Sequence, residues 1–250
     1  MTADVRVLPN ADALFRAAAE EFVRVAAEAA GARGTFSVAL SGGSTSKGLY
    51  ALLASDPALS AAVPWDRTHV FWGDERHMPP DHPDSNYRMA NETLLSKVPI
   101  PRAHVHRIAG EDKDSGRAAA AYEEELRRHF RLAPGQIPRF DLVLLGLGPE
   151  AHTASLFPGT AALDETARLV VPTWIGRLFT DRITLTAPVF NAAANVLFLV
   201  AGHYKAMALK AVLDGPYEPR QLPAQLIRPS SGRLVILADA AAARLLAKAV

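Results

Sequence analysis

Short apolar segments alternate with longer helix-like segments along most of this 250-residue chain, and this alternation constrains the fold more than any other feature. Strands that alternate with helices are typical of a mostly parallel sheet whose two faces are covered by helices. We therefore predict an α/β fold with a mostly parallel sheet. The expected strands are Thr35–Leu40, Thr68–Trp72, Asp141–Gly146, Arg182–Thr186, Asn195–Val200 and Leu234–Leu237.

Helical spacing of apolar residues predicts the connecting segments. No internal repeat, low-complexity tract or convincing linker divides the chain, and 250 residues can bury a sizeable core. We expect a single domain over residues 1–250. The predicted helices are Asp12–Ala30 (ending at Gly31), a segment running to Leu53, Asn86–Ser96, Ser115–Arg131, Tyr204–Leu213 and an Ala/Leu-rich helix that closes the chain.

The composition excludes several classes of function. The net charge is +1, so the overall charge does not favour nucleic acid or acidic membranes. The chain has no cysteine, which excludes disulfides and thiolate-bound metals. No signal peptide is recognised, and the longest apolar run, near Val196–Ala201, is far too short to span a bilayer. We expect a cytoplasmic protein without nucleic-acid or membrane partners.

Four unusual polar segments directly follow predicted strands. Ligands of open parallel sheets bind beyond the carboxyl ends of the strands, so these segments are expected to meet at one edge. This convergence is the strongest indication of a functional site that the residues give by themselves. The four segments are Ser41–Thr45, Gly73–Arg76, Gly146–His152 and Gly202–Lys205.

The first segment is suited to holding an anion. Gly42 and Gly43 permit close approach of the backbone, and the helix that follows directs free N–H groups toward a ligand. Ser44 and Thr45 can donate their hydroxyls, and Ser41 begins the turn. The segment is not a Walker A loop because the Lys-Ser/Thr pair is missing. A plain tight turn with a helix cap is the alternative interpretation.

The second segment places two carboxylates and a guanidinium after a strand. Arg76 is able to grip a phosphate in bidentate fashion. Asp74 and Glu75 would then hold that arginine, bind sugar hydroxyls, or form only surface ion pairs. Taken alone, a salt-bridged loop is the simpler interpretation.

The third segment, Gly146–Ala151, fits the pattern G-x-G-x-x-A of dinucleotide-binding folds. Pro149 inside the turn, and the lack of a second strand ending in an acid, argue against NAD binding. His152 follows the turn, and an imidazole is suited to general-base activation of water. The alternative is a loop histidine that only contacts the backbone.

The remaining candidates are cations and histidines. Lys205 begins a helix and is a plausible phosphate contact, while Arg182 and Thr186 lie in another strand that could face the same site. We interpret His104 and His106 as structural, on a shared strand face, because no nearby third ligand completes a metal site. A serine-hydrolase mechanism is not expected, because Gly-x-Ser-x-Gly is missing.

Taken together, the order and spacing of these motifs resemble the 6-phosphogluconolactonase family, which is related to the glucosamine-6-phosphate deaminases. The match runs from about Phe36 to Ile227. The residues that carry it are Leu40–Thr45, Trp72–Arg76, Asp84–Tyr87, Gly146–Gly148, His152–Pro158, Arg182–Thr186 and Gly202–Lys205.

The resemblance implies a Rossmann-like α/β fold and an enzyme that hydrolyses 6-phospho-D-glucono-1,5-lactone to 6-phosphogluconate in the oxidative pentose phosphate pathway, with no metal or organic cofactor. His152 matches the catalytic histidine, and the phosphate or sugar acid would be held by the glycine turn, Arg76, Arg182 and Lys205. We expect a small phosphorylated sugar lactone as the ligand. The protein is expected to be a monomer or a homodimer.

This sequence departs from the family pattern at two places. Glu150 and Ala151 replace the usual Asp-Gly before the histidine, and Ser46 replaces a common proline. Glu150 retains a carboxylate that could orient the imidazole, whereas Ala151 lacks the freedom of glycine at positive φ. This departure motivates the alternative of a non-catalytic sugar-phosphate sensor. A deaminase is disfavoured because His152–Pro158 lacks the glutamate found at that place in deaminases.

Overall fold

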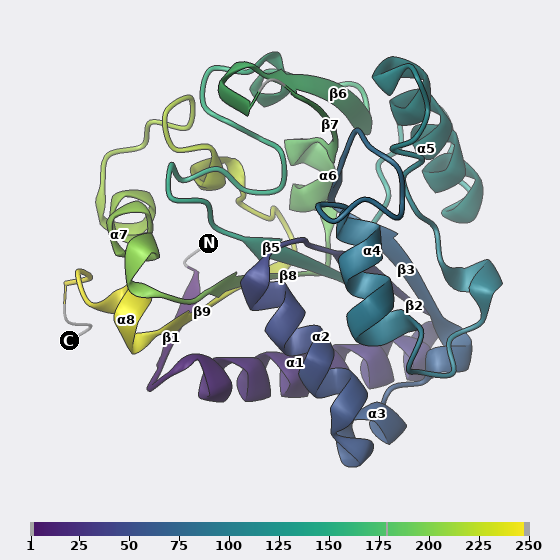
Figure 1. Cartoon of the computed structure of the whole chain (residues 1–250), viewed down its shortest axis with the longest axis horizontal. Coiled ribbons are helices and arrows are strands. Elements are labelled where there is room, and N and C mark those ends of the chain that lie inside the picture. The colour runs from purple at the N-terminus through teal and green to yellow at the C-terminus, as the bar shows by residue number, and fades with distance from the viewer. Residues whose placement is uncertain (1–2, 179, 248–250) are drawn as a thin grey trace.

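The computed structural model describes residues 3–178 and 180–247, and its main element is a six-stranded sheet in the order β1-β9-β8-β5-β2-β3 (Figure 1). All neighbouring strands in it are parallel. Its central strands are short apolar runs, as expected for strands buried on both faces. The strands are β1 (Asp4–Leu8), β2 (Phe36–Leu40), β3 (Thr68–Trp72), β5 (Leu142–Gly146), β8 (Asn195–Val200) and β9 (Arg233–Asp239).

Helices lie on both sides of this sheet. Figure 1 shows α1 and α2 together on one side, with α6 and a smaller sheet on the other. The predicted α/β class, mostly parallel with helices on both faces, is confirmed. The helices are α1 (Ala11–Arg33), α2 (Ser44–Ser55), α3 (Pro57–Ala62), α4 (Asn86–Ala90), α5 (Ser115–His129), α6 (Ala187–Ala192), α7 (Ala206–Asp214) and α8 (Ala240–Ala243).

The smaller sheet corrects the sequence prediction for Arg182–Thr186. This strand is β7 (Thr180–Leu185), and it pairs antiparallel with β4 (Asp74–Arg76) and β6 (Val170–Ile175) rather than joining the parallel sheet. Because β4 follows β3 after one residue, the small sheet begins at the carboxyl edge of the large one. It thereby brings β7 to the edge where the polar segments lie.

Several element boundaries also differ from the predictions. α1 continues through Gly31 to Arg33 and ends at Gly34, whose φ of 78° and N–H bond to the Ala30 carbonyl close the helix. Burial of Ala29 and Ala30 outweighs the poor helix propensity of Gly31. The predicted Asn86–Ser96 helix changes after Ala90 into one π-helical turn.

The predictions were wrong at three further places. His104 belongs to a 3-10 turn, and His106 follows an isolated bridge between Val105 and Val70, so the two do not share a strand. Lys205 ends a 3-10 turn, and α7 begins only at Ala206. The closing helix α8 has four residues, and residues 248–250 lie outside the described part of the chain.

Candidate active site

The four polar segments meet where the winding of the sheet changes direction. β2 lies between β3 and β5, so the chain leaves β2 toward one edge of the sheet and later returns on its other side at β5. Such a switch point opens a crevice beyond the carboxyl ends of the two strands. A cleft of about 190 Å³ lies there, and it is lined by all the predicted site residues except Glu75, Glu150 and Thr186.

A larger hollow of about 600 Å³ lies beside β8, β9 and α7. Its lining is mainly aliphatic, and Arg228 is the one ionisable side chain among the described residues that line it. It offers no group for acid–base chemistry. We therefore assign the candidate active site to the smaller, polar cleft.

The Ser41–Thr45 segment forms the turn between β2 and α2. A Cβ atom at Gly42 would lie 1.9 Å from Asn86 Oδ1, and Gly43 has a φ of 93°, so both positions require glycine. α2 begins at Ser44 without a side-chain cap, although such helix ends usually have one. Its first N–H groups and the positive end of its dipole are therefore available to an anion in the cleft.

Two arginines lie side by side on neighbouring strands of the small sheet. Arg76 of β4 and Arg182 of β7 are paired in register, and in the described chain the Nε atom of each is buried without a hydrogen-bond partner. Burial lowers the pKa of Arg182, the charge of Asp74 opposes this shift, and the nearby charge of Arg76 lowers the pKa further. A doubly charged anion would satisfy both groups and relieve their repulsion.

Asp74 and Glu75 are buried, so the alternative of surface ion pairs is wrong for both. Glu75 accepts hydrogen bonds from the N–H groups of Arg76, Asn86 and Tyr87, and it fixes the loop before α4. Burial raises its pKa. Asp74 lines the cleft and accepts a 2.7 Å bond from the Ser155 hydroxyl. Asp74 is therefore the carboxylate that can reach a ligand.

His152 has one ring nitrogen fixed and the other available. Its Nδ1 lies 2.8 Å from Glu150 Oε2, so Nδ1–H donates a hydrogen bond to the ionised carboxylate and Nε2 keeps its lone pair. The ring stacks on Phe157 with centroids 3.9 Å apart. A Cβ at Gly148 would lie 2.0 Å from the ring, so this glycine makes room for it. Glu150 lies outside the cleft lining, behind the imidazole.

Burial is the main influence on the basicity of His152. It lowers the imidazole pKa from its ordinary 6.5, while Glu150 opposes that shift. The group is therefore neutral near pH 7 and can accept a proton. Lys205 closes the same cleft from the turn after β8, and burial lowers its pKa too. The cleft thus combines three cations with one base.

The model of the Glucosamine-6-phosphate isomerases/6-phosphogluconolactonase family matches residues 9–236 of this chain. The chain belongs to this family. A 6-phosphogluconolactonase of Nostoc sp. is 43% identical over 97% of this chain and 98% of its own length. Among solved structures, the 6-phosphogluconolactonase of Trypanosoma brucei has a TM-score of 0.87 at 30% identity, over 98% of this chain and 99% of that one.

A monomeric glucosamine-6-phosphate deaminase also matches, with a TM-score of 0.79 at 20% identity over 97% of this chain and 99% of that one. At this identity the likeness shows the fold alone. The Rossmann-like fold predicted from the resemblance is thus confirmed, and it is common to both branches of the family. Residues of the cleft have to distinguish the two activities.

The departure from the family pattern at Ala151 has a clear conformational effect. Ala151 adopts a φ of 58° and is almost fully buried, so the backbone keeps the left-handed conformation that glycine would favour. Its N–H donates to the Gly148 carbonyl, and its carbonyl accepts from Ala224. The loop therefore keeps its shape and carries local strain, which costs about 1–2 kcal/mol.

We expect Ala151→Gly to change the free energy of unfolding by less than about 1 kcal/mol, because relief of strain offsets the lost methyl contacts. Ala151→Val should lower it by about 2–4 kcal/mol, because a β-branched residue fits neither the left-handed backbone nor the packed site. Urea unfolding of both variants checks this expectation. A Val variant as stable as the Gly variant would show that the positive φ is not maintained.

The dinucleotide-like pattern at Gly146–Ala151 has no matching structure. Residues 147–160 contain turns and a short bridge, and no α-helix follows β5 there. The segment instead presents His152 to the cleft. Thr186 does not face the cleft as predicted. It lies at the start of α6, where its hydroxyl donates to the Arg168 carbonyl.

Sequence reasoning assigned no role to Asn86 and Ser155, although both lay in motifs of the family. Asn86 lines the cleft, and its side-chain amide donates to the Asp74 carbonyl oxygen at 2.9 Å. Ser155 binds the Asp74 carboxylate. A polar residue at the start of the predicted Asn86–Ser96 helix was the signal for Asn86, but its partner Asp74 belongs to the small sheet.

Proposed function

We propose that this protein is a lactonase that hydrolyses 6-phospho-D-glucono-1,5-lactone to 6-phosphogluconate, the second step of the oxidative pentose phosphate pathway. One observation carries the proposal: the paired, half-buried Arg76 and Arg182 share a cleft with the Glu150-oriented base His152. An anion site and a base in one cleft suit a substrate with a phosphate at one end and a reactive carbonyl at the other. The names of the full-length relatives agree.

In the proposed complex, the phosphate lies against the Ser41–Thr45 turn. The N–H groups at the start of α2 and the guanidinium groups of Arg76 and Arg182 would bind its oxygens, and Lys205 would add a third positive charge. Asp74 would accept hydrogen bonds from sugar hydroxyls. Binding at the phosphate would position the distant lactone carbonyl near His152, so that remote binding energy contributes to orientation.

His152 Nε2 would then remove a proton from water as the oxygen of that water attacks the lactone carbonyl carbon. Nearby N–H groups or a cation would stabilise the negative charge that develops on the carbonyl oxygen. When the tetrahedral intermediate collapses, the bond from C1 to the ring oxygen breaks, and protonated His152 returns its proton to that oxygen. Glu150 would hold the imidazole and stabilise its charged form. These steps use only side chains and water.

The cellular setting of this reaction is also part of the proposal. Within the described residues, no helix is long and apolar enough to cross a membrane. We propose a cytoplasmic enzyme, in keeping with a sugar phosphate as substrate. A monomer or homodimer stays a prediction.

Turnover of freshly generated 6-phosphogluconolactone, measured against its spontaneous hydrolysis, tests the proposal. The enzyme should exceed that background, and it should release no ammonia from glucosamine 6-phosphate. A sensor would instead gain thermal stability from 6-phosphogluconate without any turnover. The retained loop conformation at Ala151 favours the enzyme over the sensor.

The pH dependence of kcat/KM should follow the protonation of His152. The base works only when unprotonated, so activity should be constant above its pKa and should fall as the pH decreases through it. Because burial lowers this pKa, the midpoint should lie below 6.5. Glu150→Gln removes the charge that raises the pKa and should shift the midpoint further down, whereas the exposed Glu124→Gln should not. A midpoint above 6.5 would contradict this assignment.

A further inference from the structure

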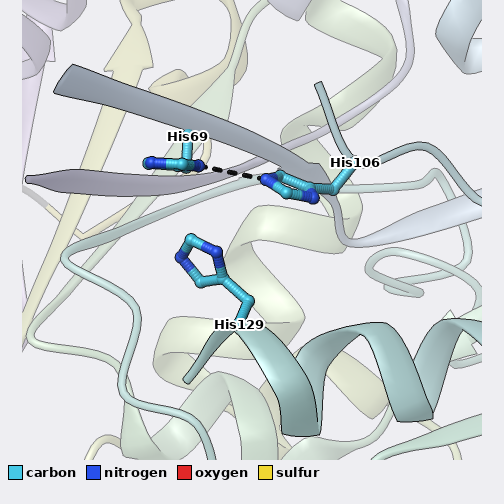
Figure 2. Close-up of side chains that lie close together, drawn as sticks. All are labelled: His69, His106 and His129. Carbon is cyan, nitrogen blue, oxygen red and sulfur yellow. Dashed lines mark hydrogen bonds between the residues drawn. The ribbon is translucent and has the colours of Figure 1, made fainter. Parts of the chain in front are cut away.

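Three histidines from separate parts of the chain come together at the edge of the large sheet. His69 lies in edge strand β3, His106 follows the bridge to that strand, and His129 is the last residue of α5 (Figure 2). One ring nitrogen of each lies within 4.8 Å of those of the other two. The interpretation that His106 has no further ligand nearby is therefore wrong, because the other two come from distant segments.

Two of the three nitrogens already have the spacing of metal ligands. His69 Nδ1 and His106 Nε2 are 3.1 Å apart and share a hydrogen bond, marked by the dashed line in Figure 2, whose proton a bound metal ion would displace. Two nitrogens bound tetrahedrally to Zn²⁺ at about 2.0–2.1 Å would lie roughly 3.3 Å apart. The ring of His129 faces the same space. Its ligand nitrogen lies within 4.8 Å of the other two, so a three-nitrogen site needs this ring to move closer to them.

A carboxylate behind His106 fixes its orientation. His106 Nδ1 lies 2.7 Å from Glu125 Oε1, so Nδ1–H donates a hydrogen bond to this carboxylate and Nε2 keeps its lone pair toward the cluster. The ring also stacks on Phe71 with an interplanar angle of 8°. A histidine that donates to a carboxylate through its second nitrogen is a recurrent arrangement around protein-bound zinc.

The surroundings of the three rings favour a cation. All three rings are half-buried, and those of His69 and His129 have centroids 4.5 Å apart. The carboxyl end of α5, where His129 lies, carries the negative end of the helix dipole. A fourth ring, His104, stacks on His69 at 4.0 Å, and in the described chain its buried Nδ1 has no hydrogen-bond partner.

We infer that His69, His106 and His129 form a binding site for one divalent transition-metal ion, Zn²⁺ in the first place. Imidazole nitrogens suit this class of ion, whereas Mg²⁺ and Ca²⁺ prefer oxygen ligands. His69 lies four residues before Gly73, roughly 13 Å along β3 from the catalytic edge, so the ion has no part in the proposed hydrolysis. It would join α5 and the His106 segment to the edge strand and so stabilise the fold.

The full-length protein, stripped of metal with a chelator, should bind one Zn²⁺ per chain in calorimetry. Zn²⁺ should also raise its melting temperature, and Co²⁺ should give the strong visible bands of a four-coordinate ion. His129→Gln and His106→Gln should each weaken binding by at least about 10-fold and abolish the thermal shift, because each removes one ligand. Circular dichroism of the metal-free variants checks that both are folded.

Two controls separate this site from other histidines. His77→Gln, which changes a histidine outside the cluster, should bind Zn²⁺ like the wild type. His152→Asn should do the same, which excludes binding in the catalytic cleft. Absence of binding, binding unaffected by both cluster variants, or binding lost with His152 would overturn the inference and leave the cluster as a packed stack of neutral rings.

Discussion

Replacement of His152 by asparagine is expected to lower kcat for lactone hydrolysis by about 10²–10⁴-fold, the usual effect of losing a general base. Asparagine preserves size and polarity but accepts no proton near neutral pH. KM should change little, because the phosphate contacts remain. The measurement is an initial rate with freshly generated 6-phosphogluconolactone, corrected for spontaneous hydrolysis.

His203→Asn is the matched control for this experiment. His203 is an exposed histidine in the turn after β8 and does not line the cleft, so this variant should keep wild-type activity. Equal melting temperatures of both variants would show that His152→Asn loses activity because the base is missing and not because the protein unfolds. Full activity of His152→Asn would refute the assignment of the base, even if the protein proved to be a lactonase.

Arg182→Gln should lower kcat/KM for the phosphorylated lactone by about 10–100-fold. A hydrogen bond to a charged group contributes about 1.5–3 kcal/mol, and Arg182 would supply such a bond to the phosphate. The loss should become much smaller with unphosphorylated glucono-1,5-lactone, which has no charge for Arg182 to bind. Arg24→Gln, at an exposed ion pair of α1, is the control and should leave both rates unchanged.

The stability of Arg182→Gln distinguishes ligand binding from a structural role. In the free protein, Arg182 is half-buried beside Arg76, and its buried Nε is unpartnered within the described chain. Removing this charge should therefore not lower the melting temperature. By contrast, 6-phosphogluconate should stabilise the wild type more than the variant. If the variant were strongly destabilised and equally impaired with both lactones, Arg182 would have a structural role instead of binding the phosphate.

The central part of this site could be predicted from the sequence because the end of each strand is marked by the residues next to it in the chain. β2, β3, β5 and β8 are short, mainly apolar runs, and a glycine or serine lies within two residues after the end of each. In a parallel sheet their carboxyl ends must lie on one edge. The prediction therefore placed Ser41–Thr45, Arg76, His152 and Lys205 together without any knowledge of their contacts, and the cleft confirms that they lie together.

Features that depend on distant pairing could not be predicted. β4 has only three residues, and its antiparallel register with β7, which opposes Arg76 to Arg182, has no local signal. The histidine cluster escaped notice for the same reason, because His69, His106 and His129 belong to three separate segments. Charged residues such as Glu75 are usually exposed, and its burial follows only from three backbone N–H groups that converge on it.

The most direct test of the whole account compares two substrates of the wild-type enzyme, 6-phosphogluconolactone and unphosphorylated glucono-1,5-lactone, under identical conditions. The phosphate should raise kcat/KM by at least about 10³-fold, because several charge-assisted bonds would each contribute 1.5–3 kcal/mol. Turnover of the phosphorylated lactone far above background, with little turnover of the other, is the predicted result. Equal rates for the two lactones, or no turnover by folded protein, would contradict the proposed function.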